Sequence, residues 1–309
     1  MKIVCYKYNK EYGCGYIKEN EIYSLFNGDF HSLNEFLVQC LIKNTTDLSI
    51  LKHAPLTSSY KLNIDDVEII APLPRPNSFR DAYAFRQHVE AGRKNRGLDM
   101  IPEYDQIPVF YFSNHNSITG PGTVNIYEKH MDKLDFELEI AIIIGSEGIN
   151  IKASDADQYI FGYTIMNDWS ARSLQMQEMK LNLGPAKGKD FATSIGPCIT
   201  TTDTMNEYKI SSEKFAKHDI PLTASVNGIK VSEDNLKNMT WSFSEIIERA
   251  SYGTSLFPGD IIGSGTCGTG CFLELNGSKN QKQWLQDGDI VEIDAGILGK
   301  LSNQIKLIK

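Results

Sequence analysis

Three acidic residues occupy every second position of segment 135–140 in this sequence: Asp135, Glu137 and Glu139. Side chains of a β-strand point alternately to its two faces, so the three carboxylates are predicted to project from one face. The apolar run 141–144 follows without alternation, which favours a strand buried on both faces. Buried carboxylates repel one another and lose hydration, so they keep protons or hold a cation. The pattern indicates an all-oxygen site for Mg²⁺, Ca²⁺ or Mn²⁺, with a solvated strand face as the alternative.

A helix is predicted around His88. From Asp81 the pattern becomes helical through residues 84–91 and ends near Gly97. Asp81 and His88 are seven residues apart, which places them on one helical face. A surface histidine on this helix is the alternative to a functional role for His88.

Residues 166–172, Met-Asn-Asp-Trp-Ser-Ala-Arg, are predicted to connect a strand to a helix. Segment 159–166 is apolar, and Asp168 stands where an N-cap belongs before the helical pattern of 170–176. A plain capping role for Asp168, with Arg172 as its ion-pair partner four residues along, is the alternative to a role in chemistry.

The chain has 309 residues and a formal net charge of −8. That length is sufficient for one large domain or two unequal ones with a sizeable core. An acidic balance without long basic runs argues against nucleic acid or an anionic membrane as the main partner and favours a small molecule. No apolar run has signal-peptide or membrane-spanning character, so a cytoplasmic protein is predicted.

Cysteine spacing indicates reduced, structural thiols. The six cysteines form no C-x-x-C pair or regular framework, which disfavours a zinc site: Cys5, Cys14, Cys40, Cys198, Cys267 and Cys271. A reactive thiol would need a base beside it, and spacing alone does not place one.

Residues 1–70 are predicted to form a small N-terminal α/β domain. Short β-type runs occupy 2–25, and a capping box at 32–35 begins an amphipathic helix that packs on them. The proline-rich segment 72–76 sustains neither a helix nor a strand ladder. We therefore place a domain boundary near residue 70, with residues 71–309 as the second domain.

The C-terminal third is predicted to be largely β. Asn227 and Gly228 between two β-type runs form the strongest hairpin signal in the chain. A capping box at 242–245 begins a helix.

A glycine-rich stretch, 263–268, has the spelling G-x-G-x-x-G of a dinucleotide fingerprint. That fingerprint must open a helix, whereas the following segment 271–275 alternates like a strand. We therefore reject a nucleotide site and interpret the stretch as a turn that carries Thr266 and Glu274 toward another site, with a plain glycine-rich connection as the alternative.

Taken together, these motifs resemble the fumarylacetoacetate hydrolase family. The residues that carry the resemblance are Asp81 with His88, Glu137 with Glu139, residues 168–172, Gly188 with Lys189, Gly265 with Thr266, and residues 273–275. The resemblance implies an α+β, mainly β fold, in which a mixed β-sheet roll follows a small N-terminal α/β subdomain. It also implies a homodimer.

The resemblance implies a role for each polar residue. The ligands of a divalent metal ion would be Asp81, Glu137, Glu139 and Asp168. His88 would be the general base, oriented by Glu274. Lys189 and Arg172 would be catalytic donors, and the substrate would contact Gln175, Thr266 and Arg172.

The implied activity is hydrolysis of a carbon–carbon bond in a 1,3-diketo acid that is similar to fumarylacetoacetate or an acylpyruvate. Water attacks one carbonyl while the other part leaves as an enolate, which the metal stabilises. Family members acting on small acylpyruvates carry the orienting acid just after the histidine, whereas Ala91 stands three residues past His88 here and Glu90 is out of register. The distant Glu274 instead matches the fumarylacetoacetate hydrolase branch.

Other activities stay open at this point. The same scaffold also hosts decarboxylases, hydratases and isomerases of 2-oxo acids, because fold does not determine the reaction. A non-catalytic metal-binding protein is a further alternative, and the acidic balance disfavours a metal-dependent nuclease.

Overall fold

A mixed sheet of 12 strands runs through the molecule. The computed structural model describes residues 1–43, 61–210, 214–276 and 283–309. In spatial order the main path of the sheet contains β4 (Lys61–Asn63), β3 (Glu21–Gly28), β2 (Glu11–Lys18), β1 (Lys2–Tyr8), β15 (Thr193–Thr201), β13 (Ile160–Asp168), β11 (Leu138–Ile144), β19 (Ile261–Gly263), β6 (Phe79–Ala82) and β7 (Phe110–Phe112). Beside this path lie β5 (Glu68–Ile70), which pairs with β1, and β8 (Ile118–Thr119), which pairs with β15.

A second sheet packs against the first across one hydrophobic core. Its five strands, in order, are β17 (Ile229–Asn235), β16 (Pro221–Val226), β20 (Ile290–Asp294), β21 (Lys300–Ile308) and β9 (Gly122–Tyr127). Two short pairs complete the β structure: β10 (Leu134–Asp135) with β14 (Ser170–Ala171), and β12 (Gly148–Ile149) with β18 (Ser255–Leu256).

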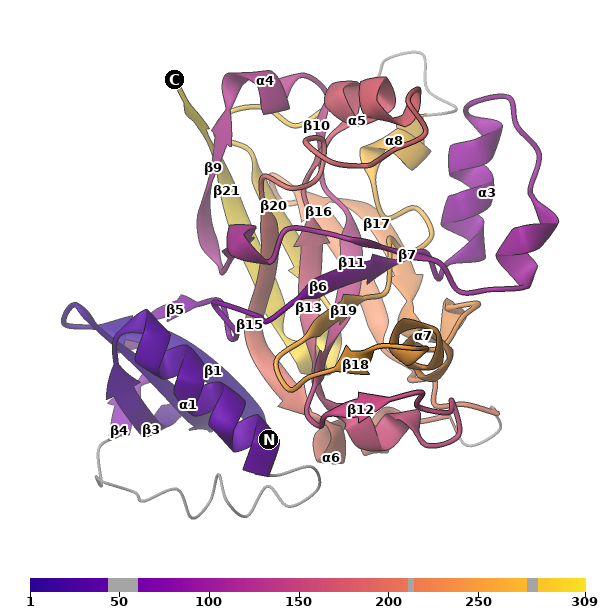
Figure 1. Cartoon of the computed structure of the whole chain (residues 1–309). Helices are drawn as coiled ribbons and strands as arrows, with labels where there is room; N and C mark the ends of the chain where they lie inside the picture. Colours follow the sequence, from indigo (N-terminus) through magenta and orange to yellow (C-terminus); the bar gives the residue numbers. More distant parts are fainter. Residues whose placement is uncertain (44–60, 211–213, 277–282) are drawn as a thin grey trace.

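The helices are short and lie around the sheets (Figure 1). They are α1 (Phe30–Lys43), α3 (Arg86–Lys94), α4 (Glu128–Met131), α5 (Arg172–Met179), α6 (Thr202–Met205), α7 (Phe243–Ser251) and α8 (Phe272–Leu275). The N-terminal strands and α1 occupy one end of the molecule, and α3 lies at the other. None of the helices in the described ranges has the length and apolar character needed to cross a membrane.

The predicted mainly β, α+β architecture is confirmed. The Asn227-Gly228 turn joins β16 to β17, as its sequence predicts. The capping box at 242–245 is also confirmed, because the Ser242 side chain accepts from the Glu245 backbone while the Glu245 side chain accepts from the Ser242 backbone. In both places, residues close together in the sequence determine the local structure.

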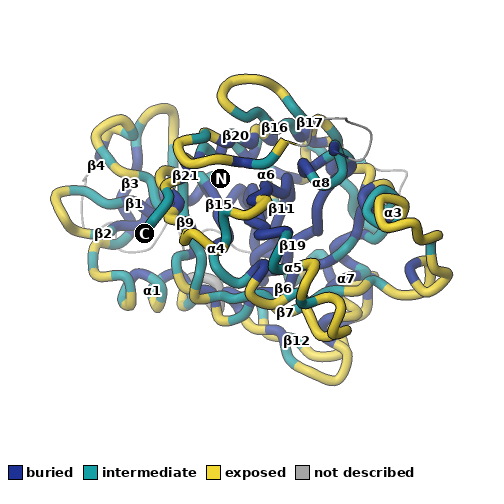
Figure 2. Tube along the Cα trace, turned by 90° about the horizontal axis from the view of Figure 1, so that it is seen from above, coloured by how far each residue is buried: buried dark blue, intermediate teal, exposed yellow. Residues whose placement is uncertain are grey.

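Strand β11 is buried on both faces, as the unbroken apolar run predicts. Ile140 and Ile142 belong to the core between the two sheets, whereas Ala141 and Ile143 belong to a separate core on the opposite face. Figure 2 shows the central strands as buried, with exposed segments confined to the periphery. The carboxylates at the start of β11 therefore enter the interior, which excludes a solvated strand face.

Asp81 and His88 do not share a helical face, so that prediction is wrong. Asp81 lies on β6, which pairs with β19 on one side and β7 on the other, and α3 begins only at Arg86. The backbone groups around Asp81 bond to two neighbouring strands, and this tertiary pairing overrides the local helical pattern.

The prediction that a helix begins at Asp168 is also wrong. Asp168 is the last residue of β13, paired with Thr193 of β15, and α5 begins at Arg172. The residue before α5, Ala171, provides no side-chain cap. Strand pairing again decides the local structure, and the plain capping role for Asp168 is excluded.

Two further local predictions need correction. Helix α1 begins at Phe30, two residues before the predicted capping box, because the Asp29 carboxylate accepts from the Ser32 backbone at 2.8 Å. Residues 271–275 form no strand but contain the short helix α8. The Asp135 carboxylate accepts from the first two backbone N–H groups of α8 at 2.8 and 2.9 Å. That cap comes from a distant segment, which local alternation does not reveal.

The N-terminal strands continue the central sheet. Lys2 and Ile3 of β1 pair with Thr200 and Ile199 of β15. The boundary near residue 70 stays a prediction.

Strand β19 brings β6 and β11 together over a glycine. Gly263 pairs with Ala141 on one side and with Asp81 on the other. A Cβ at Gly263 would lie 2.4 Å from both Asp81 Oδ1 and Met166 Cε. The first glycine of the 263–268 stretch therefore leaves space for the Asp81 carboxylate.

We expect Gly263→Ala to lower the free energy of unfolding by about 1–3 kcal/mol, because overpacking a dense core forces neighbours to move. Chemical denaturation measures this change. The matched control is Gly92→Ala, whose Cβ would lie 3.7 Å from its nearest neighbour, in a helix. Equal stability of the two variants would contradict the proposed close approach.

Candidate active site

Three carboxylates from three strands of the central sheet meet in the interior. Asp81 comes from β6, Glu139 from β11 and Asp168 from the end of β13. Each offers an oxygen within 4.8 Å of the others, and the three residues are at most 3% exposed. The register of β6, β19, β11 and β13 produces this acidic triad, Asp81–Glu139–Asp168.

The triad fits a hard divalent cation. Thr266 Oγ1 donates to Glu139 Oε1 at 3.1 Å, and Gly265 N donates to Asp81 Oδ1 at 3.1 Å. Glu139 Oε2 is buried, and no hydrogen-bond partner reaches it within the described ranges. An unpartnered buried carboxylate oxygen is costly, and a cation would compensate it.

Electrostatics supports the same conclusion. Burial, followed by the nearby Asp168, raises the pKa of Asp81 to about 8. Burial and the Asp81 charge also raise the pKa of Glu139 well above its ordinary value. Without a cation, the triad therefore retains protons at neutral pH.

Glu137 stands next to the triad but is held by two cations of the chain. Its oxygens accept from Arg172 Nη2 at 2.8 Å and from Lys189 Nζ. Burial would raise its pKa, but Lys189 and Arg172 outweigh that effect and lower the pKa of Glu137 to about 2. Glu137 is therefore an ionised carboxylate, and its role as a fourth metal ligand stays a prediction.

Arg172 is buried and binds three side chains. Asp168, the ion-pair partner that the sequence offered as an alternative, is not among them. The Arg172 guanidinium binds Asp135 at 2.8–2.9 Å, Glu137 at 2.8 Å and Gln175 Oε1 at 3.0 Å. Because Gln175 accepts through Oε1, its NH₂ donors point away from Arg172. Arg172 thus orients an amide that borders the cavity.

Lys189 links Glu137 to the triad. Its ammonium donates to Asp168 Oδ2 at 2.7 Å and contacts Glu137. Burial would lower its pKa, but Asp168 and Glu137 raise it, so Lys189 remains charged. Tyr111 also donates to Asp168 Oδ2, at 2.7 Å.

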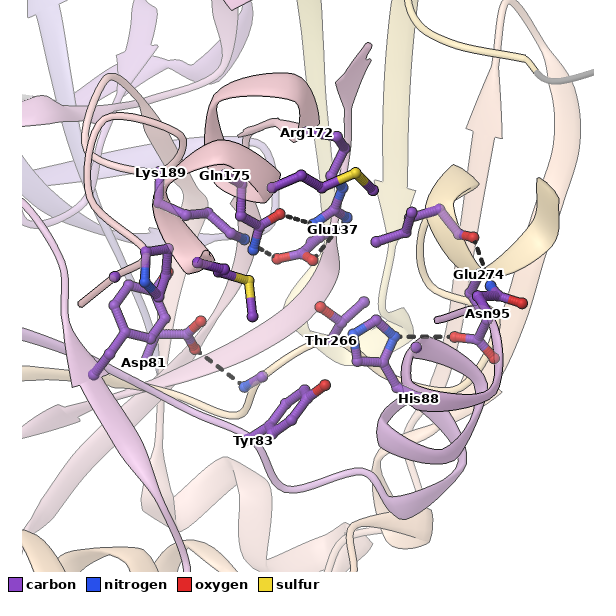
Figure 3. Close-up of a pocket in the computed structure, with 18 of the residues that line it drawn as sticks. Asp81, Tyr83, His88, Asn95, Glu137, Arg172, Gln175, Lys189, Thr266 and Glu274 are labelled. Atoms are coloured by element: carbon purple, nitrogen blue, oxygen red, sulfur yellow. Dashed lines mark hydrogen bonds and ion pairs between the residues drawn. The ribbon is translucent and has the colours of Figure 1, made fainter. Parts of the chain in front are cut away.

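His88 and Glu274 form a dyad from segments far apart in the sequence. His88 Nδ1 lies 3.0 Å from Glu274 Oε2, and their side chains are 9% and 7% exposed. The two come from α3 and α8, and Figure 3 shows the dyad beside Thr266. An ionised carboxylate only accepts hydrogen bonds, so Nδ1 carries the proton and Nε2 is left with a lone pair.

A cavity of about 890 Å³ joins these groups. Eight of the residues singled out from the sequence line it: Asp81, His88, Glu137, Arg172, Gln175, Lys189, Thr266 and Glu274. The other two, Glu139 and Asp168, are fully buried and contact Thr266 and Lys189 from the cavity wall. The structure therefore brings all ten side chains together.

Sequence reasoning missed several residues of this site. Tyr83 and Tyr111 line the cavity, and Asn95 donates to the Leu273 carbonyl at 3.1 Å, which ties α3 to α8. Asp135 was recognised only as part of the acidic ladder, whereas it anchors Arg172 and caps α8. Aromatic residues in or directly after short strands, such as Tyr111 and Tyr83, give no signal that separates a cavity wall from a core.

Comparison with known proteins identifies the family. The profile of the fumarylacetoacetate (FAA) hydrolase C-terminal family matches residues 77–306, so the chain belongs to the fumarylacetoacetate hydrolase family. Fumarylacetoacetase of Oryza sativa subsp. japonica is 31% identical over 291 residues, which span 77% of this chain and 67% of that protein. Oxaloacetate tautomerase YisK of Bacillus subtilis (strain 168) is 31% identical over 252 residues, which span 80% of this chain and 76% of that protein.

A solved structure extends the likeness to the whole fold. The fumarylacetoacetate hydrolase of psychrophilic Exiguobacterium antarcticum superposes with a TM-score of 0.74 at 25% identity, covering 100% of both chains. The predicted family and its β-rich fold are confirmed. The chain is an enzyme of this superfamily that acts on a small molecule, and its relatives include both hydrolases and tautomerases.

Divalent cations should stabilise the protein through the triad. At a Mg²⁺ or Mn²⁺ concentration 100 times the Kd, binding adds about 2.7 kcal/mol to the free energy of unfolding. Glu139→Gln should lose most of this gain, because an amide replaces an anionic ligand. Thermal unfolding with and without cation measures it, with Glu233→Gln, an exposed carboxylate paired with Lys230, as the control. Equal stabilisation of both variants would exclude the triad as the site.

Cation binding should weaken as pH falls from about 8 to about 6, because the cation must displace protons from the triad. The raised pKa of Asp81 means that the folded, cation-free protein holds a proton that the unfolded chain releases. The stability from that proton is complete at low pH and is lost as pH rises through about 8. Unfolding temperatures against pH, with and without Mg²⁺, should therefore diverge as pH rises. Parallel curves, or curves unchanged in Asp81→Asn, would contradict this account.

Proposed function

We propose that the protein is a metal-dependent hydrolase that cleaves a carbon–carbon bond of a 1,3-diketo acid. The His88–Glu274 dyad carries the proposal, because its hydrogen bond leaves Nε2 able to take a proton at the cavity. The reaction needs that proton acceptor together with a means of holding an enolate. Both lie within one cavity here.

The residues of the triad, Asp81, Glu139 and Asp168, would hold the divalent ion, with Glu137 as the predicted fourth ligand. When bound, such an ion acts as a Lewis acid on the diketone and stabilises the enolate that departs.

His88 would begin the reaction by accepting a proton from water at Nε2. The water oxygen then forms a bond to one carbonyl carbon, and Glu274 favours the imidazolium that results. The carbon–carbon bond breaks, its electron pair becomes the enolate, and the imidazolium returns the proton to the enolate carbon. The products are a carboxylic acid and a ketone, and His88 is neutral again.

Lys189 and Gln175 would supply donors to the tetrahedral oxyanion. Lys189 has three N–H bonds, and its contacts with Glu137 and Asp168 leave one for a substrate oxygen. Arg172 uses most of its N–H groups on Asp135, Glu137 and Gln175, so it acts mainly by orienting the Gln175 amide. Removing one oxyanion donor typically costs about 10²–10³ in rate.

Tautomerisation of a 2-oxo acid is a second candidate, favoured by the 31% identity to an oxaloacetate tautomerase. Here Nε2 of His88 would remove a proton from the carbon beside the ketone, and the proton would return to the enolate oxygen to form the enol. No water attacks and no carbon–carbon bond breaks. Decarboxylation and hydration stay alternatives on the same scaffold.

A substrate panel separates these reactions. It contains 1,3-diketo acids with different acyl groups and oxaloacetate, assayed with Mg²⁺ or Mn²⁺. Hydrolysis yields one carboxylic acid and one ketone. Tautomerisation breaks no carbon–carbon bond and yields only keto–enol exchange, seen as deuterium uptake from D₂O. If no diketo acid is cleaved while oxaloacetate undergoes rapid keto–enol exchange, the hydrolase proposal is overturned in favour of the tautomerase.

His88→Ala and Glu274→Gln should each lower kcat on the best panel substrate, the histidine variant by about 10²–10⁴. The double variant should be scarcely slower than the worse single variant, because both changes disable one proton transfer. His31→Ala and Glu35→Gln are matched controls, since His31 Nε2 and Glu35 Oε1 form a 3.1 Å pair whose side chains are 74% and 66% exposed. Additive losses in the dyad, or equal losses in the control pair, would contradict the role of the dyad.

A further inference from the structure

Cys271 gives the dyad a third metal-binding group that the proposed reaction does not use. Its thiol Sγ lies 4.0 Å from His88 Nδ1, the same ring nitrogen that contacts Glu274. The three potential ligand atoms, of His88, Cys271 and Glu274, lie within 4.8 Å of one another. Cysteine spacing disfavours a zinc site, but the fold places one sulfur beside a histidine and a carboxylate.

We propose that His88, Cys271 and Glu274 form a binding site for Zn²⁺ that switches the enzyme off. The site is separate in its ligands from the acidic triad, and its donors are nitrogen, sulfur and oxygen. Zn²⁺ binds such sets with four-coordinate, tetrahedral geometry. Three protein ligands leave one position for water.

The distances suit a tetrahedral ion after small movements. With bonds of about 2.0–2.3 Å, tetrahedral geometry places neighbouring ligand atoms about 3.3–3.6 Å apart. The nitrogen–oxygen distance of 3.0 Å must lengthen by a few tenths of an ångström, and the nitrogen–sulfur distance of 4.0 Å must shorten by about as much. The sulfur–oxygen distance is within 4.8 Å and must close to about 3.6 Å, so the Cys271 and Glu274 side chains approach each other on binding.

Zn²⁺ has a route to these atoms. His88 and Glu274 line the cavity. Cys271 is fully buried, and its sulfur lies 4.0 Å from Nδ1 of His88, the nitrogen that contacts Glu274. On binding, the thiol releases its proton to the buffer and the sulfur becomes the anionic ligand. The acidic triad has only oxygen donors, so it suits harder ions such as Mg²⁺ and competes less well for Zn²⁺.

Metal at Nδ1 removes the base. A neutral imidazole carries one proton and one lone pair, so an ion on the Nδ1 lone pair forces the proton onto Nε2. Nε2 then cannot accept a proton from water or from a carbon acid, and Glu274 no longer orients the ring. The loss of turnover rests on the proposed function, whereas metal binding itself does not.

Cobalt absorption tests the site without any substrate. The full chain, with excess Mg²⁺ to occupy the triad, is titrated with Co²⁺ and monitored for thiolate-to-cobalt charge transfer in the near ultraviolet. One equivalent should produce the band in the parent and in Cys267→Ser, a control in the same segment whose thiol is also fully buried. Cys271→Ser should show no band, and Zn²⁺ should displace Co²⁺ from the parent.

The proposal is overturned if the parent shows no band, or if the band survives in Cys271→Ser. Should Cys271→Ser not fold, Cys271→Ala and His88→Gln replace it, and each must weaken Co²⁺ binding at least about 10-fold, since even residues outside a ligand set change metal affinity roughly 10–100-fold. Unchanged Co²⁺ affinity in the variants that fold would overturn the site.

Inhibition is measured separately on the best panel substrate, with each variant compared with its own rate without Zn²⁺. The Zn²⁺ concentration that halves turnover should rise at least about 10-fold in Cys271→Ser and stay unchanged in Cys267→Ser. A cobalt band without inhibition would retain the site and contradict the role of His88 as base. Inhibition without a band would place the inhibitory ion elsewhere and overturn the proposal.

Discussion

The interior of this enzyme depends on how buried carboxylates are compensated. Asp135, Glu137 and Asp168 are buried, and each is paired with Arg172 or Lys189. Removing one partner from such a network leaves an uncompensated charge, which costs more than the pair contributes. Glu139 and Asp81 have no such cation. Asp168 therefore belongs both to this ion-pair network and to the acidic triad, whereas Asp81 and Glu139 need a proton or a metal ion for compensation.

The sheet is what brings these groups together. β11 and β13 contribute acids from neighbouring positions, and β19, with glycine at 263, lets Asp81 of β6 approach Glu139. The hydrophobic cores on the two faces of β11 hold the strand in register, because a slip of one residue would reverse its faces. The triad carboxylates are therefore carried by buried strands, whereas the His88–Glu274 dyad comes from two short helices, α3 and α8, that border the cavity.

The groups proposed for proton transfer and those proposed for cation binding lie in different parts of the site. The acid cluster keeps hard oxygen donors and fixed charge, while the dyad offers a ring nitrogen whose lone pair is directed by Glu274. In the proposed reaction, this separation would let His88 act as a base near a cation that it does not bind. Cys271 introduces a softer donor at the dyad, so the two parts differ in the metal ions that they suit.

The sequence alone was sufficient to identify the family, because its acidic and aromatic motifs are distinctive in combination, and the ten polar side chains that it singled out lie together in the structure. It also predicted the hairpin at Asn227 and the cap at Ser242, where the partners lie a few residues apart. It failed at Asp81, Asp168 and α8, where strand pairing or the distant Asp135 carboxylate decides the local structure. Only the tertiary structure paired Arg172 with Asp135 and Glu137, and only it placed Cys271 beside His88. Those contacts join residues more than 30 positions apart, and no local pattern encodes such distances.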